Sequence, residues 1–187
     1  GVPGYMLTDG PHGLRKENSE TAALDMANTV PATCFPPAAG MSSTWNPDLV
    51  REVVKVMGEE CVQEKVAVIL GPGVNIKRNP LGGRSFEYWS EDPYLAGHEA
   101  VGIVEGVQSQ GVGTSLKHFA ANNQETDRLR INARITERTL REIYLPAFEH
   151  IVKTAQPWTI MCAYNRLNGV FGSENRRLLT DVLRHEW

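Results

Sequence analysis

Short apolar runs recur along the 187-residue chain, and each is ended by glycine, proline or a polar residue. The runs that we expect to form strands are 5–8, 66–70, 112–119 and 159–163. The run at 66–70 reads Val-Ala-Val-Ile-Leu, and such a continuous apolar, β-branched run is typical of a strand buried on both faces. A weaker run at 31–36 is closed at once by Pro37, so we expect little strand there.

Between these runs, apolar residues recur at three- and four-residue spacing, which predicts helices. Asn46 and Asp92 each precede a proline, a pair typical of an N-cap followed by the first helical turn. A third helix should begin at Thr136 and run to about residue 155 with a kink at Pro146, and a fourth should begin at Asn175. Strand then helix, with crossovers of roughly 45 residues, predicts a parallel β/α architecture.

Composition excludes several classes of protein. A net charge of −3 gives no basic field for nucleic acid or an anionic membrane, and no apolar stretch of about 20 residues exists to span a bilayer. Cys34, Cys61 and Cys162 stand far apart without metal-type spacing, so we expect reduced thiols and favour a cytoplasmic location. The chain starts without Met and stops at Trp187 directly after a predicted helix, so we expect both ends to lie inside a larger fold.

Polar residues follow the carboxyl end of each predicted strand. Asp9, the turn 71–73, the pair Lys117-His118 and the pair Tyr164-Asn165 occupy these positions. Because the carboxyl ends of parallel strands share one rim, we expect a functional site there. A carboxylate that accepts from two hydroxyls, cations that donate to their neighbours and flat aromatic faces together indicate a sugar.

Other chemistries have less support. No metal-binding or nucleophilic-serine motif is present, so we expect neither a metal nor a cofactor. Pro72 in the middle of the glycine turn removes an N–H that a phosphate cradle would use. Of the five histidines, His118 alone falls in the rim set, and we expect the others to be surface residues: His12, His98, His150 and His185.

Five segments resemble the N-terminal part of glycoside hydrolase family 3 β-glucosidases, in that family's order and at its usual spacing. They are LTDGPHGLR (7–15), PGVNIKRNPLGGRSFEYWSEDPYLAG (72–97), SLKHFAANNQETDR (115–128), MCAYNRLNG (161–169) and SENRRLLTDVLRHEW (173–187). The resemblance spans nearly the whole chain. It implies an α/β fold over residues 1–187, a partial (β/α)8 TIM-barrel-like domain truncated before the strand that carries the nucleophile.

The resemblance also implies a set of residues that bind the glycone. Asp9 resembles the carboxylate that grips two hydroxyls, and Arg15 resembles the arginine that orients that carboxylate or the sugar. Arg84 matches an arginine that reaches the same ring. Two small departures from the family pattern, Gly82 and Ser85, concern packing more than ring contacts.

Further matches lie on the later strands. Lys117 and His118 match a pair that donates to ring hydroxyls, and Arg128 matches an arginine that closes the following loop near the nucleophile. Tyr164, and more weakly Met161, match residues that flank the nucleophile on the next strand.

No catalytic carboxylate is assigned in this chain. The resemblance places the nucleophile in a Ser-Asp-Trp motif beyond Trp187 and the acid/base in a second domain. Asp181 lies inside the last predicted helix and Glu174 in the loop before it, so neither replaces the nucleophile. The resemblance thus implies a retaining, exo-acting β-glucosidase or β-xylosidase of which this chain, inactive alone, supplies the glycone-binding part. The segment KHFAANNQE disfavours the family's N-acetylhexosaminidases, which carry a KHFPGHG-like segment.

Two alternatives stay open: a non-catalytic carbohydrate-binding fragment, and a different β/α-barrel enzyme that acts on phosphorylated substrates. As partners we expect a β-linked glucoside or oligosaccharide, and neither nucleic acid nor membrane. An open barrel leaves an unpaired edge strand. We therefore expect it to pack against the remainder of its own polypeptide or to self-associate, with poor stability in isolation.

Overall fold

A parallel sheet of four strands forms the centre of the fold. The computed structural model describes residues 1, 3–18 and 28–187. The strands are β1 (Met6–Asp9), β2 (Val66–Leu70), β3 (Gly113–Phe119) and β5 (Thr159–Cys162), in the order β1-β2-β3-β5. All neighbouring pairs are parallel, so the predicted α/β class and strand positions are confirmed. Residues 31–36 form no strand.

The longer helices begin at the predicted caps. Asn46 Oδ1 accepts a hydrogen bond from the Leu49 N–H at 3.1 Å at the start of α2 (Pro47–Gln63). Asp92 Oδ1 accepts from the Tyr94 N–H at 2.9 Å at the start of α3 (Pro93–Gln108). A short helix, α1 (Ala38–Ser42), precedes them and was not predicted.

The expected single helix from Thr136 to about residue 155 is wrong in detail. The segment consists of α4 (Glu137–Thr139), a π-helical turn η1 (Leu140–Tyr144) and α5 (Pro146–Ala155). The Leu145 N–H bonds to the Leu140 carbonyl at 3.0 Å, five residues back, and Pro146 then has no N–H with which to continue the ladder. Proline therefore separates two helical segments here instead of kinking one.

The C-terminal part also differs from the pattern. A 3-10 turn, η2 (Gly172–Glu174), precedes a π-helical segment, η3 (Arg177–Glu186), which begins two residues after the predicted start. Asn175 still caps this segment, since its Oδ1 accepts from the Leu178 N–H at 3.1 Å. A second sheet, β4-β6-β7, was not predicted and consists of Asn132–Ala133, Arg166–Leu167 and Val170–Phe171.

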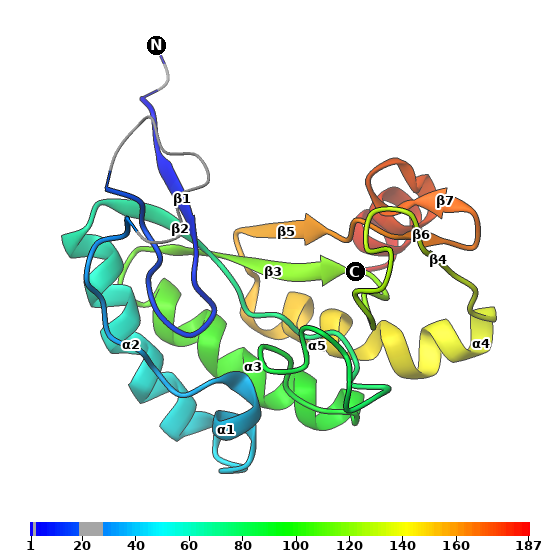
Figure 1. Ribbon diagram of the computed structural model, residues 1–187, viewed down its shortest axis with the longest axis horizontal. Helices are drawn as coiled ribbons and strands as arrows, with labels where there is room; N and C mark the ends of the chain where they lie inside the picture. The colour runs from blue at the N-terminus through cyan, green and yellow to red at the C-terminus, as the bar shows by residue number, and fades with distance from the viewer. Residues whose placement is uncertain (2, 19–27) are drawn as a thin grey trace.

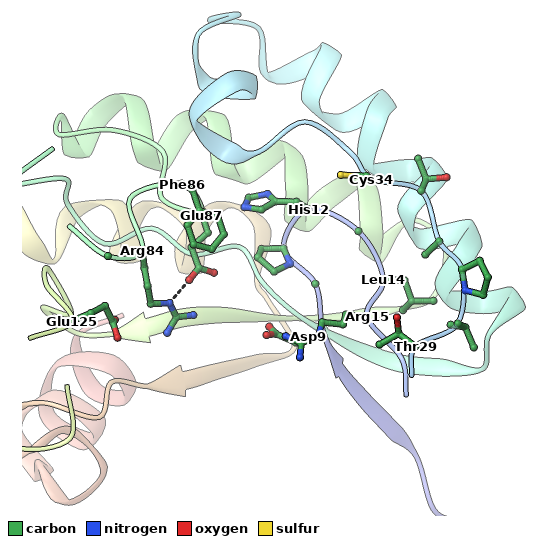
Figure 2. Close-up of a pocket in the computed structure, with 18 of the residues that line it drawn as sticks. Asp9, His12, Leu14, Arg15, Thr29, Cys34, Arg84, Phe86, Glu87 and Glu125 are labelled. Carbon is green, nitrogen blue, oxygen red and sulfur yellow. Dashed lines mark hydrogen bonds and ion pairs between the residues drawn. The ribbon is translucent and has the colours of Figure 1, made fainter. Parts of the chain in front are cut away.

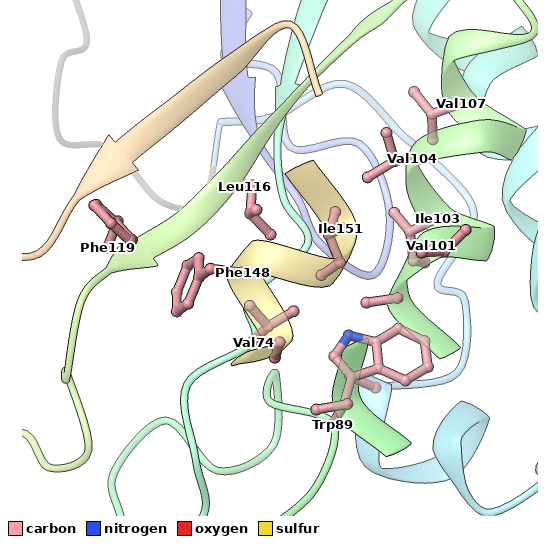
Figure 3. Close-up of a cluster of buried hydrophobic side chains, with 14 of the residues drawn as sticks. Val74, Trp89, Val101, Ile103, Val104, Val107, Leu116, Phe119, Phe148 and Ile151 are labelled. Atoms are coloured by element: carbon pink, nitrogen blue, oxygen red, sulfur yellow. The ribbon is translucent and has the colours of Figure 1, made fainter. Parts of the chain in front are cut away.

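Helices α2, α3 and α5 lie along one side of the central sheet (Figure 1). Figure 3 shows the apolar layer between them, in which Leu116 of β3 meets Phe148 and Ile151 of α5. Gly106 lets α2 and α3 approach closely, because a Cβ there would lie 2.6 Å from the Arg51 carbonyl oxygen. The helices cover one face of the sheet. The carboxyl ends of the strands lie at an edge of the sheet, where the loops that follow them can form a site.

Candidate functional site

A cavity of about 860 Å³ opens at the carboxyl end of β1. Figure 2 shows Arg84 and Glu87 on one side of it and Asp9, His12 and Arg15 on the other. The full lining is 9–15, 29–34, Gly83, Arg84, Phe86, Glu87, Glu125 and Arg128. Four separate segments of the chain, 9–15, 29–34, 83–87 and 125–128, therefore meet at this cavity.

The loop after β1 is a tight turn that presents Asp9. The Arg15 N–H bonds to the Asp9 carbonyl at 3.1 Å, which closes the turn. Gly10 has φ +136° and faces the Gly13 carbonyl so closely that a Cβ would lie 1.9 Å from its oxygen. Glycine is therefore required for this turn, and the turn fixes the direction of the Asp9 side chain.

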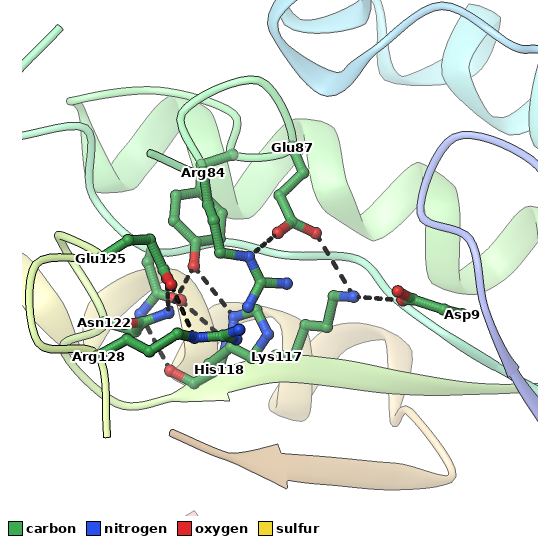
Figure 4. Close-up of polar contacts among 10 residues, drawn as sticks. Asp9, Arg84, Glu87, Lys117, His118, Asn122, Glu125 and Arg128 are labelled. Atoms are coloured by element: carbon green, nitrogen blue, oxygen red, sulfur yellow. Dashed lines mark hydrogen bonds and ion pairs between the residues drawn. The ribbon is translucent and has the colours of Figure 1, made fainter. Parts of the chain in front are cut away.

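A buried lysine connects β3 to β1 (Figure 4). Lys117 is only 1% exposed, and its Nζ lies 3.0 Å from Asp9 Oδ1 and 3.4 Å from Glu87 Oε2. Glu87, also buried, accepts from the Nε of Arg84 through its other oxygen. Two cations and two carboxylates thus form one continuous network whose charges balance.

The network shifts the pKa values of the residues at its two ends, Asp9 and Arg84. Burial alone would raise the pKa of Asp9, but the Lys117 ammonium, as charge and as hydrogen-bond donor, brings that pKa below its usual value. Burial works against the charged Arg84 guanidinium, yet its hydrogen bond and ion pair with Glu87 raise the pKa of Arg84. Asp9 therefore stays an anionic acceptor and Arg84 a cationic donor beside the cavity.

His118 is buried beside this network and is held on several sides. Its peptide N–H donates to Asn75 Oδ1 at 2.9 Å, and its carbonyl accepts from Asn75 Nδ2 at 3.0 Å. Its ring Nδ1 lies 3.0 Å from the Tyr88 hydroxyl oxygen. Burial, with Arg84, Lys117 and Arg128 nearby, lowers the pKa of His118 to about 2, so the ring is neutral.

Arg128 lies at the open side of the site. Its Nε is 2.8 Å from Glu125 Oε2, and its guanidinium carbon stands 5.0 Å from the centre of the Tyr164 ring. Tyr164 is itself 53% exposed. Met161 is half-buried on β5, in register with Lys117.

The structure brings most of the predicted residues together. Asp9, Arg15, Arg84 and Arg128 line the cavity. Lys117 contacts the Asp9 of that lining directly.

His118 is linked to the cavity through two other residues. Its ring contacts the Tyr88 hydroxyl, and the NH2 group of Asn122 donates both to that hydroxyl and to Glu125, which lines the cavity. Tyr164 and Met161 are outside the lining, although Tyr164 stacks against Arg128.

Two site residues were missed. Glu87 and Glu125 lie in polar loops without periodicity, and their only sequence signal was proximity to residues already chosen.

The expected surface position is wrong for the ring of His12 and only partly met by His98 and His150. His12 lines the cavity beside Phe86, at 5.8 Å between ring centres, and burial lowers the pKa of His12. His98 and His150 are half-buried and stack 4.0 Å apart between α3 and α5. His185 is exposed as expected.

Neither a metal centre nor a membrane span is found in the described part of the chain. No group of three His, Cys, Asp or Glu side chains is placed there to hold a metal ion. No helix there is both long and apolar enough to cross a membrane.

A parallel sheet with helices on one side and a polar cavity at the carboxyl ends of its strands defines a domain of the β/α-barrel class. The family model of the glycosyl hydrolase family 3 N terminal domain matches residues 23–187, and the chain belongs to this family.

Similar proteins span the whole chain. An exo-alpha-(1->6)-L-arabinopyranosidase of Bifidobacterium breve is 76% identical over 100% of this chain and 25% of its own length. The crystal structure of a Bifidobacterium adolescentis GH3 beta-glucosidase matches with a TM-score of 0.92 and 76% identity, over 100% of this chain and 26% of that one.

Beta-glucosidase 3B of Thermotoga neapolitana, in complex with alpha-D-glucose, matches with a TM-score of 0.93 and 52% identity, over 100% and 26% of the two chains. The present chain thus spans about 25% of the length of the curated relatives it matches.

Proposed function

We propose that this chain is the glycone-binding part of a retaining, exo-acting glycoside hydrolase. The observation that carries the proposal is the network of Asp9, Lys117, Glu87 and Arg84 at the carboxyl ends of the strands. It presents a carboxylate beside fixed cationic donors at a cavity of about 860 Å³, room for a monosaccharide with part of its aglycone.

The position of each polar residue at the cavity suggests which hydrogen bonds it makes to the sugar. Asp9 accepts from two neighbouring hydroxyls, while Lys117 and Arg84 donate to hydroxyl oxygens of the same ring. Arg15 lines the same cavity and is expected to orient Asp9 or the sugar. His118 adds a neutral donor, which is developed below.

The remaining predicted residues form the rim. Arg128 and Tyr164, already stacked on each other, would border the reacting carbon, and Met161 on β5, whose match to the family is weaker, would also flank the nucleophile. This part of the proposal rests on the family resemblance and on their place beside the site.

The reaction needs a nucleophile and an acid/base that we assign outside residues 1–187. A retaining glycosidase holds these two carboxyl groups about 5 Å apart, with the nucleophile free to attack the anomeric carbon. Glu87 and Glu125 are instead engaged by arginines at hydrogen-bond distance. Asp181 and Glu174 are not part of the cavity lining.

Two substrate classes have support. Beta-glucosidases, one with alpha-D-glucose bound, support a terminal β-D-glucoside. The arabinopyranosidase that is 76% identical supports an α-L-arabinopyranoside, a six-membered ring that, like a β-xyloside, lacks the exocyclic carbon of glucose. Hydrolysis of the p-nitrophenyl derivatives of β-D-glucose, β-D-xylose, α-L-arabinopyranose and N-acetyl-β-D-glucosamine by the full-length gene product decides between them.

The decisive variant is Asp9→Asn in that full-length product. Loss of two charge-assisted hydrogen bonds, at about 1.5 kcal/mol each, should lower kcat/KM about 100-fold. Asp48→Asn on α2 is the matched control, since Asp48 is exposed and paired only with Arg51 in the described part of the chain. Hydrolysis of none of the four glycosides, or an unchanged kcat/KM for Asp9→Asn, refutes the proposal.

The charge balance disfavours a phosphorylated substrate. Lys117, Arg84 and Arg128 each already have a carboxylate within hydrogen-bond distance. A phosphate would have to displace these partners, whereas a neutral polyol adds hydrogen bonds without disturbing the pairs. Stronger binding of glucose 6-phosphate than of glucose would favour the phosphorylated class instead.

The outer strand β1 indicates where the rest of the polypeptide packs. Tyr5, Met6 and Leu7 are between 43% and 68% exposed, although they belong to a strand of the central sheet or adjoin it. We propose that further strands of the same polypeptide cover them. A concentration-independent monomer of the isolated chain that melts in one sharp transition would contradict this.

A further inference from the structure

His118 stands at the end of a chain of hydrogen bonds that begins at the cavity lining (Figure 4). Glu125 Oε1 lies 3.0 Å from Asn122 Nδ2, and the same Nδ2 lies 3.0 Å from the Tyr88 hydroxyl oxygen. That hydroxyl oxygen is 3.0 Å from Nδ1 of His118. Tyr88, His118 and Asn122 are all buried, so solvent does not compete for these groups.

Glu125 determines which way the Asn122 amide points. Glu125 is paired with Arg128 at 2.8 Å, and a carboxylate in such a pair only accepts hydrogen bonds. The Asn122 group that faces it must therefore be the NH2 group, because the amide oxygen would meet another acceptor. The second hydrogen of that NH2 group is then directed to the Tyr88 oxygen.

This fixes the proton of Tyr88. Its oxygen accepts from Asn122, and its own O–H has one acceptor in reach among the described residues, Nδ1 of His118. Burial raises the pKa of Tyr88, so the hydroxyl keeps its proton, and the low pKa of His118 leaves the ring neutral with one N–H.

We propose that Glu125, Asn122 and Tyr88 form a relay that holds His118 in the tautomer with its proton on Nε2, so that His118 offers its ligand a hydrogen-bond donor. None of the three needs to touch the ligand, so they are positioning residues. Nε2 has no hydrogen-bond partner among the described residues, which leaves it available.

The consequence for recognition rests on the proposed function. An Nε2–H donates to a hydroxyl oxygen of the sugar, and that hydroxyl is then free to donate onward. With Lys117 and Arg84 close by, this position accepts an oxygen lone pair and rejects an ammonium, which brings only donors and a like charge. The relay therefore selects neutral sugars over amino sugars at the ring position that His118 faces.

The tautomer is measured directly by histidine-selective 15N labelling of the full-length gene product, with His118→Gln to assign the signal. Long-range 15N–1H spectra between about pH 5 and 8 should show Nδ1 unprotonated and Nε2 protonated throughout. A protonated Nδ1 in the parent protein overturns the proposal. This result needs no substrate, so it stands or fails separately from the proposed glycosidase activity.

Tyr88→Phe removes the donor to Nδ1 and should shift His118 to a mixture of tautomers. Asn122→Ala, a second variant in case Tyr88→Phe fails to fold, frees the Tyr88 proton and should increase the Nδ1–H form. Tyr94→Phe is the matched control, because Tyr94 is 69% exposed on α3 and contacts His98 instead. Unchanged His118 spectra in both relay variants overturn the relay.

Deoxy sugars separate positioning from a general structural role. Removing the hydroxyl that faces His118 should weaken binding about tenfold in the parent protein, because the hydrogen bond from His118 Nε2–H to the sugar is lost. The same deoxy sugar should lose far less affinity in Tyr88→Phe, because that variant has already weakened this hydrogen bond. The other monodeoxy glucoses should lose affinity equally in both proteins. An equal loss for every deoxy sugar means that Tyr88 is structural only, and it overturns the proposal.

Discussion

Glu87→Gln removes the buried carboxylate that joins two cations of the site. Glu87 Oε2 lies 3.4 Å from Lys117 Nζ, and both residues are at most 2% exposed. At an effective dielectric constant of about 20, that one ion pair corresponds to about 5 kcal/mol of Coulomb energy.

The net effect is smaller than the Coulomb energy. The carboxylate no longer has to be desolvated, and glutamine keeps one acceptor oxygen. Removing one partner of a buried pair usually costs about 3–5 kcal/mol, so we expect the free energy of unfolding to fall by about 3 kcal/mol.

Urea unfolding of the purified protein, followed by tryptophan fluorescence, measures this change. Glu105→Gln is the matched control: Glu105 lies 2.8 Å from the Nε of Arg51, but the pair is partly exposed, so the loss should stay below about 1 kcal/mol. In a protein that already carries Lys117→Met, Glu87→Gln should lower the free energy of unfolding by clearly less than it does alone, because the ammonium that pairs with the Glu87 carboxylate is absent. A loss below about 1 kcal/mol for Glu87→Gln with an unchanged slope, or additive losses with Lys117→Met, would refute the reasoning.

Three further predictions concern pH, packing and capping. The folded pKa of His118, about 2, lies below its ordinary value of 6.5, so the stability that its neutral ring contributes is complete above about pH 6.5 and is lost as the pH falls below it. Between about pH 7.5 and 5.5 the parent protein should therefore lose about 1.4 kcal/mol more unfolding free energy than His118→Gln, and equal losses would contradict this. Gly106→Ala should force α2 from α3, because the new Cβ would lie 2.6 Å from the Arg51 carbonyl oxygen, and should lower the unfolding free energy by about 2 kcal/mol; an unchanged melting temperature would disprove the close approach. Asn46→Ala removes the acceptor of the Leu49 N–H at 3.1 Å and should cost about 1 kcal/mol in the same assay, with Asn46→Asp as the variant that retains the cap.

The strands and capped helices were predictable because their signals are local. The run at 66–70 is apolar throughout and ends at glycine, and it forms β2 with those bounds. The two-residue strand β4 carries no such signal, since it pairs with β6 across 34 residues of sequence, as between Asn132 and Arg166, whereas β6 and β7 pair locally across the turn Asn168-Gly169. Likewise, Pro146 predicted a kink in the helix, but only the hydrogen bond from the Leu145 N–H to the Leu140 carbonyl shows the π-helical turn before it.

Site residues at the end of a strand could be predicted from the sequence, whereas site residues within a long loop could not. Lys117 and Asp9 were chosen from position, and they contact each other at 3.0 Å. Glu87 was missed because the loop at 74–92 has no periodicity, so nothing local indicates which of its polar residues turn inward. Its partner Lys117 lies 30 residues further along the chain.

The buried half of the site and its open half should respond differently to mutation. Lys117 and His118 are at most 2% exposed and have most of their polar groups satisfied within the protein, so their positions are set before a ligand arrives. The side chains of Asp9 and Arg128 are 47% and 45% exposed, and Tyr164 is 53% exposed. Binding orders these groups at a conformational cost that the buried half does not incur. Conservative substitutions in the buried half should therefore change both the free energy of unfolding and the affinity for sugar. The same kind of substitution at Arg128 or Tyr164 should change affinity alone, whereas a substitution at Asp9 also removes a carboxylate paired with the buried Lys117. A Tyr164→Phe protein that unfolds as easily as the Glu87→Gln protein would show that this division is wrong.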